Sequence, residues 1–133
     1  MAEPMQVEVV SADEVVWSGE ATNIIAKTVD GDIGILANHS PVLAVLVPGG
    51  VEIVCPDGAR EIVAVEGGFM SVNLGRVSIL SEYAKLAREI SLNEAERDLA
   101  AANSAIDAGD DSEETRTRFL RATAQVKAAH KAS

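Results

Sequence analysis

Residues 22–36 read TNIIAKTVDGDIGIL, which is two short runs of β-forming residues on either side of Asp30-Gly31. Gly31 can adopt the positive φ that a tight turn needs, so the stretch predicts two β-strands joined by a hairpin. The same pattern continues in both directions. The other runs are Gln6–Val10, Glu14–Trp17, Leu43–Val47, Val51–Val54, Glu61–Val65, Phe69–Val72 and Val77–Leu80, and the other turn signals are Ser18-Gly19, Gly49-Gly50, Asp57-Gly58, Gly67-Gly68 and Leu74-Gly75. Short strands at this spacing predict an antiparallel β-sandwich or flattened barrel.

From about residue 84 the apolar residues recur every three or four positions, which is the period of an α-helix. Ser91 and Glu94 have the capping-box spacing that begins a helix, and Gly109 can close it. Asp111 or Ser112 can then cap a second helix. The residues expected on the shared faces are Leu92, Ala95, Leu99, Ala102 and Ile106, and then Phe119, Ala122, Val126 and Ala129. We therefore predict an α+β protein, with a β-sandwich domain over residues 1–86 and an antiparallel helical hairpin over residues 87–133.

Composition and charge exclude several classes of function. The apolar fraction of 47% can bury a core, whereas the net charge of −10 argues against binding to nucleic acid or to anionic lipid. No run approaches the roughly 20 apolar residues of a membrane span, so direct membrane insertion is not expected. Residues 1–4, MAEP, lack the basic and apolar regions of a secretory signal. The single Cys55 fits a reducing cytoplasm.

The residues that could carry out chemistry do not form a recognisable constellation. His39 and Cys55 lie in separate turn regions, without metal-ligand spacing. Ser40 or Ser71 could pair with His39, but neither lies in a nucleophile-elbow motif. The glycine pairs fall at hairpin turns, and no phosphate-binding G-x-x-x-x-G-K-[ST] motif occurs. We therefore expect no catalytic residues, no metal site and no cofactor.

Charge is divided unevenly between the two predicted helices. From Glu89 to Asp111 there are seven acidic residues and Arg97 is the single basic one. The second helix carries most of the cations of this region, which are Arg116, Arg118, Arg121, Lys127 and Lys131. These cations could complement the acids of the first helix, or they could form a basic surface for an acidic partner.

The order of several motifs resembles one known family. Residues 31–36, GDIGIL, followed by 39–43, HSPVL, resemble the epsilon subunits of F-type ATP synthases, whose mitochondrial counterpart is the delta subunit. The resemblance extends in register over about the first 85 residues. It rests further on residues 9–12 VVSA, 17–19 WSG, 48–49 PG, 51–53 VEI, 66–72 EGGFMSV and 77–84 VSILSEYA. Ala37-Asn38 stands where many relatives have Pro-Gly, and Asn38 can adopt the left-handed conformation of that glycine.

This resemblance implies a non-catalytic rotor subunit of a bacterial enzyme. The sandwich would lie at the foot of the central stalk, bound to the gamma subunit and resting on the c-subunit ring. There it would couple proton-driven rotation of the ring to ATP synthesis, as a peripheral protein on the cytoplasmic face of the cell membrane. The residues that match the family's partner-binding positions are Asp32, Ile33, Gly34, His39, Pro41 and Leu43.

The resemblance also implies that the hairpin regulates ATP hydrolysis. In relatives it switches between a folded-down form and an extended, inhibitory form that contacts the catalytic alpha/beta head. The basic residues that fit this role are Arg116, Arg118, Arg121 and Lys127. A seam made largely of alanine buries little apolar area, so the hairpin can act as a bistable element.

A nucleotide motif of the family is degenerate in this chain. Some relatives bind ATP through I-D-x-x-R-A, and the matching residues here are Ile90, Ser91, Glu94 and Ala95. Glu94 places a negative charge where the family's arginine would meet a phosphate. We therefore expect weak or no ATP binding at this motif.

Two other classes of function remain open from the sequence. One is an autonomous β-sandwich that binds a ligand and dimerises through its helices. The other is a small β-sandwich enzyme that uses His39, whose activity a His39→Ala change would abolish. A rotor subunit, by contrast, should co-purify with the gamma subunit.

Overall fold

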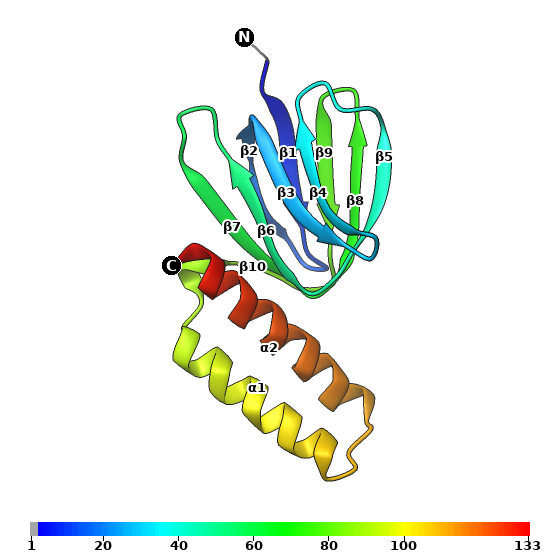
Figure 1. The fold of residues 1–133 in the computed structure, drawn as a ribbon, viewed down its shortest axis with the longest axis vertical. Coiled ribbons are helices and arrows are strands. Elements are labelled where there is room, and N and C mark those ends of the chain that lie inside the picture. Colours follow the sequence, from blue (N-terminus) through cyan, green and yellow to red (C-terminus); the bar gives the residue numbers. More distant parts are fainter. Residues whose placement is uncertain (1–2) are drawn as a thin grey trace.

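The computed structural model describes residues 3–133. Met1 and Ala2, which belong to the segment expected not to be a secretory signal, lie outside the described residues. Figure 1 shows strands wrapped into two layers, with a pair of helices against one end. The strands are β1 (Met5–Val10), β2 (Val15–Ala21), β3 (Asn23–Thr28), β4 (Gly31–Leu36), β5 (Val42–Leu46), β6 (Gly49–Val54), β7 (Arg60–Val65), β8 (Gly68–Asn73), β9 (Arg76–Leu80) and β10 (Ala84–Leu86). The predicted fold class, a β-sandwich followed by a helical hairpin, is confirmed.

The strands pair in the order β10-β7-β6-β3-β5-β8-β9-β1-β2, and β4 pairs with β3. β10 and β2, at the two ends of this order, also contact each other, so the sandwich is nearly a closed barrel. The expectation of a wholly antiparallel sheet is wrong at one place, because β1 and β9 run parallel. Alternate side chains along most strands point inward and form a core of aliphatic residues and methionine, including Met5, Ile24, Ile35, Ile53, Met70 and Ile79.

Most of the predicted turns are confirmed, because Gly31, Gly58, Gly67 and Gly75 all have positive φ. Two turn signals are wrong. Gly19 lies inside β2, opposite Val7, and its missing side chain leaves room for the Trp17 ring. Gly49 and Gly50 lie inside β6, opposite Val65 and Ala64. Asn38 does not adopt the left-handed conformation that was considered for it. Among the described residues, Leu74 is the one non-glycine residue with positive φ.

The helices are η1 (Ala87–Glu89), α1 (Leu92–Asp107) and α2 (Glu113–Ala132). Ser91 caps α1 as predicted, because its hydroxyl accepts a hydrogen bond from the Glu94 backbone N–H at 3.3 Å. Ser112, rather than Asp111, caps α2 by accepting from the Thr115 N–H at 3.2 Å. Hydrogen bonds from the Thr115 hydroxyl and from the Ser112 N–H hold the pKa of Asp110 down at about 2. The turn between the helices is therefore tied by an ionised carboxylate at any physiological pH.

The hairpin is folded onto the sandwich, with α2 between α1 and the sheet (Figure 1). Ala122 on α2 and Ala95 and Ala102 on α1 are buried. A second face of α2 packs on β6 and β7, which sequence periodicity did not indicate. This second contact consists of small and medium apolar residues, namely Ile62, Ala64, Ala87, Ala124 and Ala128, with Ile90 at its edge. The apolar face predicted for α1 is not buried along its whole length, because Ile106 near the end of the helix is 41% exposed.

Candidate interaction surface

Strand register places a row of apolar side chains on the outside of the sandwich. Val45 on β5 lies opposite Phe69 on β8, and Phe69 lies opposite Leu80 on β9. Val10 continues the row on β1, as the parallel partner of Leu80. Val45, Phe69 and Leu80 are 43%, 50% and 49% exposed. We refer to Val10, Val45, Phe69 and Leu80 as the outer apolar row. Contiguous exposed apolar patches often mark interaction sites, whereas apolar side chains that are exposed singly are ordinary.

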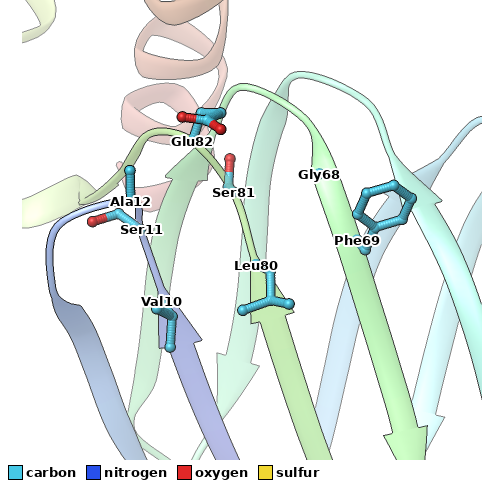
Figure 2. A pocket seen from close by; sticks show the side chains of 8 residues that line it. All are labelled: Val10, Ser11, Ala12, Gly68, Phe69, Leu80, Ser81 and Glu82. Carbon is cyan, nitrogen blue, oxygen red and sulfur yellow. The ribbon is translucent and has the colours of Figure 1, made fainter.

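A hollow of about 270 Å³ lies at one end of this row, and Figure 2 shows its lining. Val10, Leu80 and Phe69 come from neighbouring strands, while Ser11 and Ala12 lie in the loop after β1. Gly68 forms part of the wall. A Cβ atom added there would lie 2.0 Å from the Leu80 carbonyl oxygen. The φ of Gly68 is +101°, a backbone conformation that glycine adopts readily and other residues rarely do. The close approach of β8 and β9 that aligns the row therefore depends on this glycine.

The structure brings together some of the residues predicted to bind partners. Asp32 and Ile33 on β4 line a second hollow, of about 270 Å³, together with Leu43 and Val45 on β5. Leu43 is 69% exposed, and Asp32 is also exposed. This hollow therefore continues the outer apolar row toward β4, which pairs with β3 alone within residues 3–133.

The other predicted partner-binding residues lie apart from that hollow. Gly34 is exposed further along β4. His39 lies half-buried in the loop between β4 and β5, with its Nδ1 atom 2.6 Å from the Ser40 carbonyl oxygen. Pro41 is exposed just before β5. The roles of all six residues stay predictions.

The outer apolar row itself was not predicted. The sequence does hold a signal for it, because Val9-Val10, Val45-Leu46, Phe69-Met70 and Ile79-Leu80 are adjacent apolar pairs within strands. Successive side chains of a strand point to opposite faces, so one member of each pair must point away from the core. The buried members are Val9, Leu46, Met70 and Ile79.

The basic residues assigned to the second helix do not form one surface. Arg121 points to the sandwich, where its Nε atom lies 3.0 Å from Oε2 of Glu66 and its guanidinium lies 5.2 Å from the centre of the Tyr83 ring. Gln125 Nε2 donates a hydrogen bond to the Tyr83 hydroxyl at 2.5 Å. We refer to Glu66, Tyr83, Arg121 and Gln125 as the docking cluster, because it joins α2 to the sandwich.

The other three basic residues lie at different places. Arg116 lines a hollow at the turn between the helices, Arg118 is exposed, and Lys127 lies near Gly49. The alternative in which α2 cations pair with α1 acids is not supported, since within the described residues the one such contact between these helices is His130 Nε2 to Glu96 Oε1, at 3.7 Å. Arg121 pairs instead with the sandwich, because α2 rather than α1 faces the sheet.

The residues that could bind a metal ion or act as a nucleophile do not form a cluster within the described part of the chain. Among residues 3–133, no three His, Cys, Asp or Glu side chains are grouped so that they could hold a metal ion. Burial, and then the negative charges of Asp57 and Glu61, raise the pKa of the Cys55 thiol, which makes it a poorer nucleophile. In the part of the chain that the structure describes, no helix combines the length and apolarity needed to cross a membrane.

These features define a class of protein, a β-sandwich with an exposed apolar row that carries a C-terminal helical hairpin. The family model "ATP synthase, Delta/Epsilon chain, beta-sandwich domain" matches residues 4–87. The chain is 48% identical over 108 residues to the ATP synthase epsilon chain of Streptomyces griseus. This match covers 81% of the present chain and 87% of the Streptomyces chain. It is 48% identical over 128 residues to that of Thermobifida fusca, covering 92% and 90%. The chain therefore belongs to the family of ATP synthase epsilon chains.

Other similarities agree with this assignment. The epsilon chain of Cutibacterium acnes is 50% identical over 96 residues, a match that spans 71% of this chain and 66% of that one. A chain in the structure of the Euglena gracilis mitochondrial ATP synthase, OSCP/F1/c-ring, superposes with a TM-score of 0.76 at 24% identity, covering 97% of this chain and 81% of that one. A chain of the Tetrahymena thermophila mitochondrial ATP synthase central stalk/c-ring gives 0.59 at 17% identity, covering 98% and 97%. At these identities the two structures support the fold.

Proposed function

We propose that this chain is a non-catalytic subunit of the central stalk of a bacterial F-type ATP synthase. The outer apolar row binds the gamma subunit, and the β4 edge with Asp32 faces the c-subunit ring. In this position the sandwich helps to couple ring rotation to ATP synthesis, as a peripheral protein on the cytoplasmic face of the membrane. The observation that carries the proposal is the outer apolar row, because a family member that works inside a complex needs a surface that is apolar and accessible.

The alternative of a dimerisation arm is less well supported. A helical arm that joins two copies needs an uncovered apolar face, whereas the apolar faces of α2 pack on α1 and on the sheet. Apart from Ile106 at the end of α1, the exposed large apolar side chains of the described residues lie on the sandwich.

We expect Phe69→Asp to weaken binding to the gamma subunit by about thirtyfold or more. An aromatic residue at the centre of an interface typically contributes about 2 kcal/mol or more, and a buried unpaired carboxylate adds a desolvation penalty. Phe69 is half-exposed, so the change should leave the sandwich folded. The measurement is the dissociation constant of the full chain and the purified gamma subunit.

Leu74→Asp is the matched control for this change. Leu74 is 86% exposed in the turn between β8 and β9, so the control adds the same charge to an apolar position away from the row. Its φ of 50° also suits aspartate. Equal affinities of the two variants for gamma would place the interface elsewhere.

We further propose that the sandwich is an independent domain and that the hairpin restrains ATP hydrolysis. Removal of residues 90–133 should leave the sandwich folded, because its main core contains no residue of α1 or α2. ATPase activity of the assembled enzyme should rise by about severalfold, since the inhibitory element is gone. Folding of the fragment is checked by the fluorescence of Trp17, and hydrolysis by phosphate release. An ATPase rate equal to that of the complete enzyme would contradict the regulatory role.

A further inference from the structure

The hollow at the end of the outer apolar row ends in a negative charge that the row itself does not explain. Val10, Phe69 and Leu80 give the hollow an apolar lining. Figure 2 shows the carboxylate of Glu82 at one end of it, next to the hydroxyl of Ser81. Glu82 is the one charged residue among the eight described residues that line the hollow. An apolar lining that ends at a single carboxylate differs both from an all-apolar groove and from a solvated acidic surface.

The backbone holds Glu82 at this end of the hollow. The Ser81 N–H donates a hydrogen bond to the Val10 carbonyl oxygen at 3.1 Å, which extends the pairing of β1 with β9 by one residue. The buried Ser81 hydroxyl donates to the Tyr83 carbonyl oxygen at 2.8 Å, and the same oxygen accepts from the Glu66 N–H at 3.4 Å. Both neighbours of Glu82 in the chain are therefore fixed, and the carboxylate stands on a defined bend between β9 and β10.

Glu82 has no cationic partner within the described residues. It is exposed, and the ion pairs found in residues 3–133 do not include it. Arg121 of the docking cluster is paired with Glu66 instead. The loop after β1, which contributes to the lining of the hollow, goes on with two more exposed acids, Asp13 and Glu14. The electrostatic potential at this end of the hollow therefore favours a cation.

Size and chemistry favour one long basic side chain as the occupant. The volume of about 270 Å³ is below the roughly 300 Å³ at which pockets for small molecules begin. A basic side chain can lay its apolar stem along an apolar surface while its head reaches a carboxylate. Arginine fits better than lysine, because its planar fork can donate two hydrogen bonds to one carboxylate and can stack on an aromatic ring such as Phe69. A purely apolar occupant would desolvate Glu82 without giving it a partner, which is costly.

We propose that this hollow binds an arginine side chain of the gamma subunit and that Glu82 is the residue that selects it. The inference rests on the proposed function, because the hollow shares Val10, Phe69 and Leu80 with the outer apolar row. The row supplies apolar contact area, which by itself discriminates weakly between different registers of two surfaces. The paired charge at Glu82 fixes one register, because any other register leaves the carboxylate unpaired.

The test is the dissociation constant of the full chain and the purified gamma subunit at low ionic strength, measured for Glu82→Gln. Glutamine keeps the size of the side chain but removes its charge, so the affinity should fall by about tenfold or more. Glu82→Asp keeps the charge and should lose less. Glu113→Gln is the matched control, because it removes an exposed carboxylate at the start of α2, and it should bind like the parent chain. Added salt should weaken the parent more than Glu82→Gln.

A double-mutant cycle identifies the occupant of the hollow. Each surface arginine of gamma is changed to alanine in turn, and each variant is titrated with the parent chain and with Glu82→Gln. One of these changes should weaken binding to the parent by about tenfold and weaken binding to Glu82→Gln much less. Coupling of Glu82 to a lysine of gamma, or to no basic residue of gamma, would contradict the assignment to arginine.

Equal affinities of Glu82→Gln, the control and the parent chain for gamma would overturn the proposal. If Phe69→Asp still weakens binding in that case, the outer apolar row remains the interface and the inference about Glu82 alone fails. A parent chain that does not bind gamma would overturn both the inference and the proposed function.

Discussion

Gly68→Ala is expected to destabilise the sandwich by about 3–5 kcal/mol, which is a large part of the roughly 5–15 kcal/mol that holds a typical domain together. Two costs combine at this position. A φ of +101° is strained for alanine, and the new Cβ atom would lie 2.0 Å from the Leu80 carbonyl oxygen. Strands β8 and β9 must therefore move apart, which disturbs both the core and the outer apolar row.

The measurement is urea unfolding followed by the fluorescence of Trp17, which packs against the core and is the single tryptophan of the chain. Gly58→Ala serves as the control, because Gly58 also has a positive φ, of +88°, but nothing lies within 4 Å of an added Cβ atom. The control should show backbone strain alone, a loss of about 1–2 kcal/mol. Similar losses in the two variants would mean that the close approach at Gly68 is not a constraint.

Gly50→Ala is expected to release α2 from the sheet while the sandwich stays folded. The backbone of Gly50 is ordinary strand, so alanine is compatible with it, but the added Cβ atom would lie 2.9 Å from the Ala128 Cα and 3.1 Å from Ile62 Cγ2. The helix must move away, at a cost of about 1–3 kcal/mol. A cost of this size should raise the undocked fraction by about ten- to a hundredfold.

Hydrogen exchange of the α2 amides measures this release directly. Exchange should quicken in α2 and stay slow in β1, β8 and β9, which form the far side of the sandwich. Gly49→Ala is the control, because its added Cβ atom meets its nearest neighbour at an ordinary 3.9 Å. Unchanged exchange in α2, or faster exchange throughout the sandwich, would count against a separately docked hairpin.

Local chemistry made much of the fold predictable. Gly31, Gly58 and Gly75 mark turns because few other residues adopt their φ values, and Ser91 marks a helix start because its hydroxyl caps a backbone N–H. Pairing between distant strands has no such local signal. The parallel pairing of β1 with β9 and the short strand β10 therefore escaped prediction.

Glycine was also misinterpreted where its role depends on a distant element. Gly50 stands in a strand because α2 needs the space above it, a contact that joins residues far apart in the chain. The same helix explains the scattered basic residues. Arg121 was assigned to a basic surface, but a helix that packs on both α1 and the sheet turns it toward Glu66.

The candidate site was predictable in part. Family motifs indicated Asp32, Ile33 and Leu43, which line one hollow. They did not mark Phe69 or Leu80 as partner-binding residues, and the adjacent apolar pairs that contain them do not show that their outward members lie side by side. The register of β8 and β9 is what aligns these two residues on the surface.

The most direct test of the account is photo-cross-linking from position 69 in the assembled enzyme. A benzophenone side chain in place of Phe69 keeps the position aromatic, and the account predicts an adduct with the gamma subunit. The same group at position 74, in the exposed turn between β8 and β9, is the control and should give much less of that adduct. An assembled complex in which position 69 forms no adduct with gamma would contradict the claim that the outer apolar row binds the stalk.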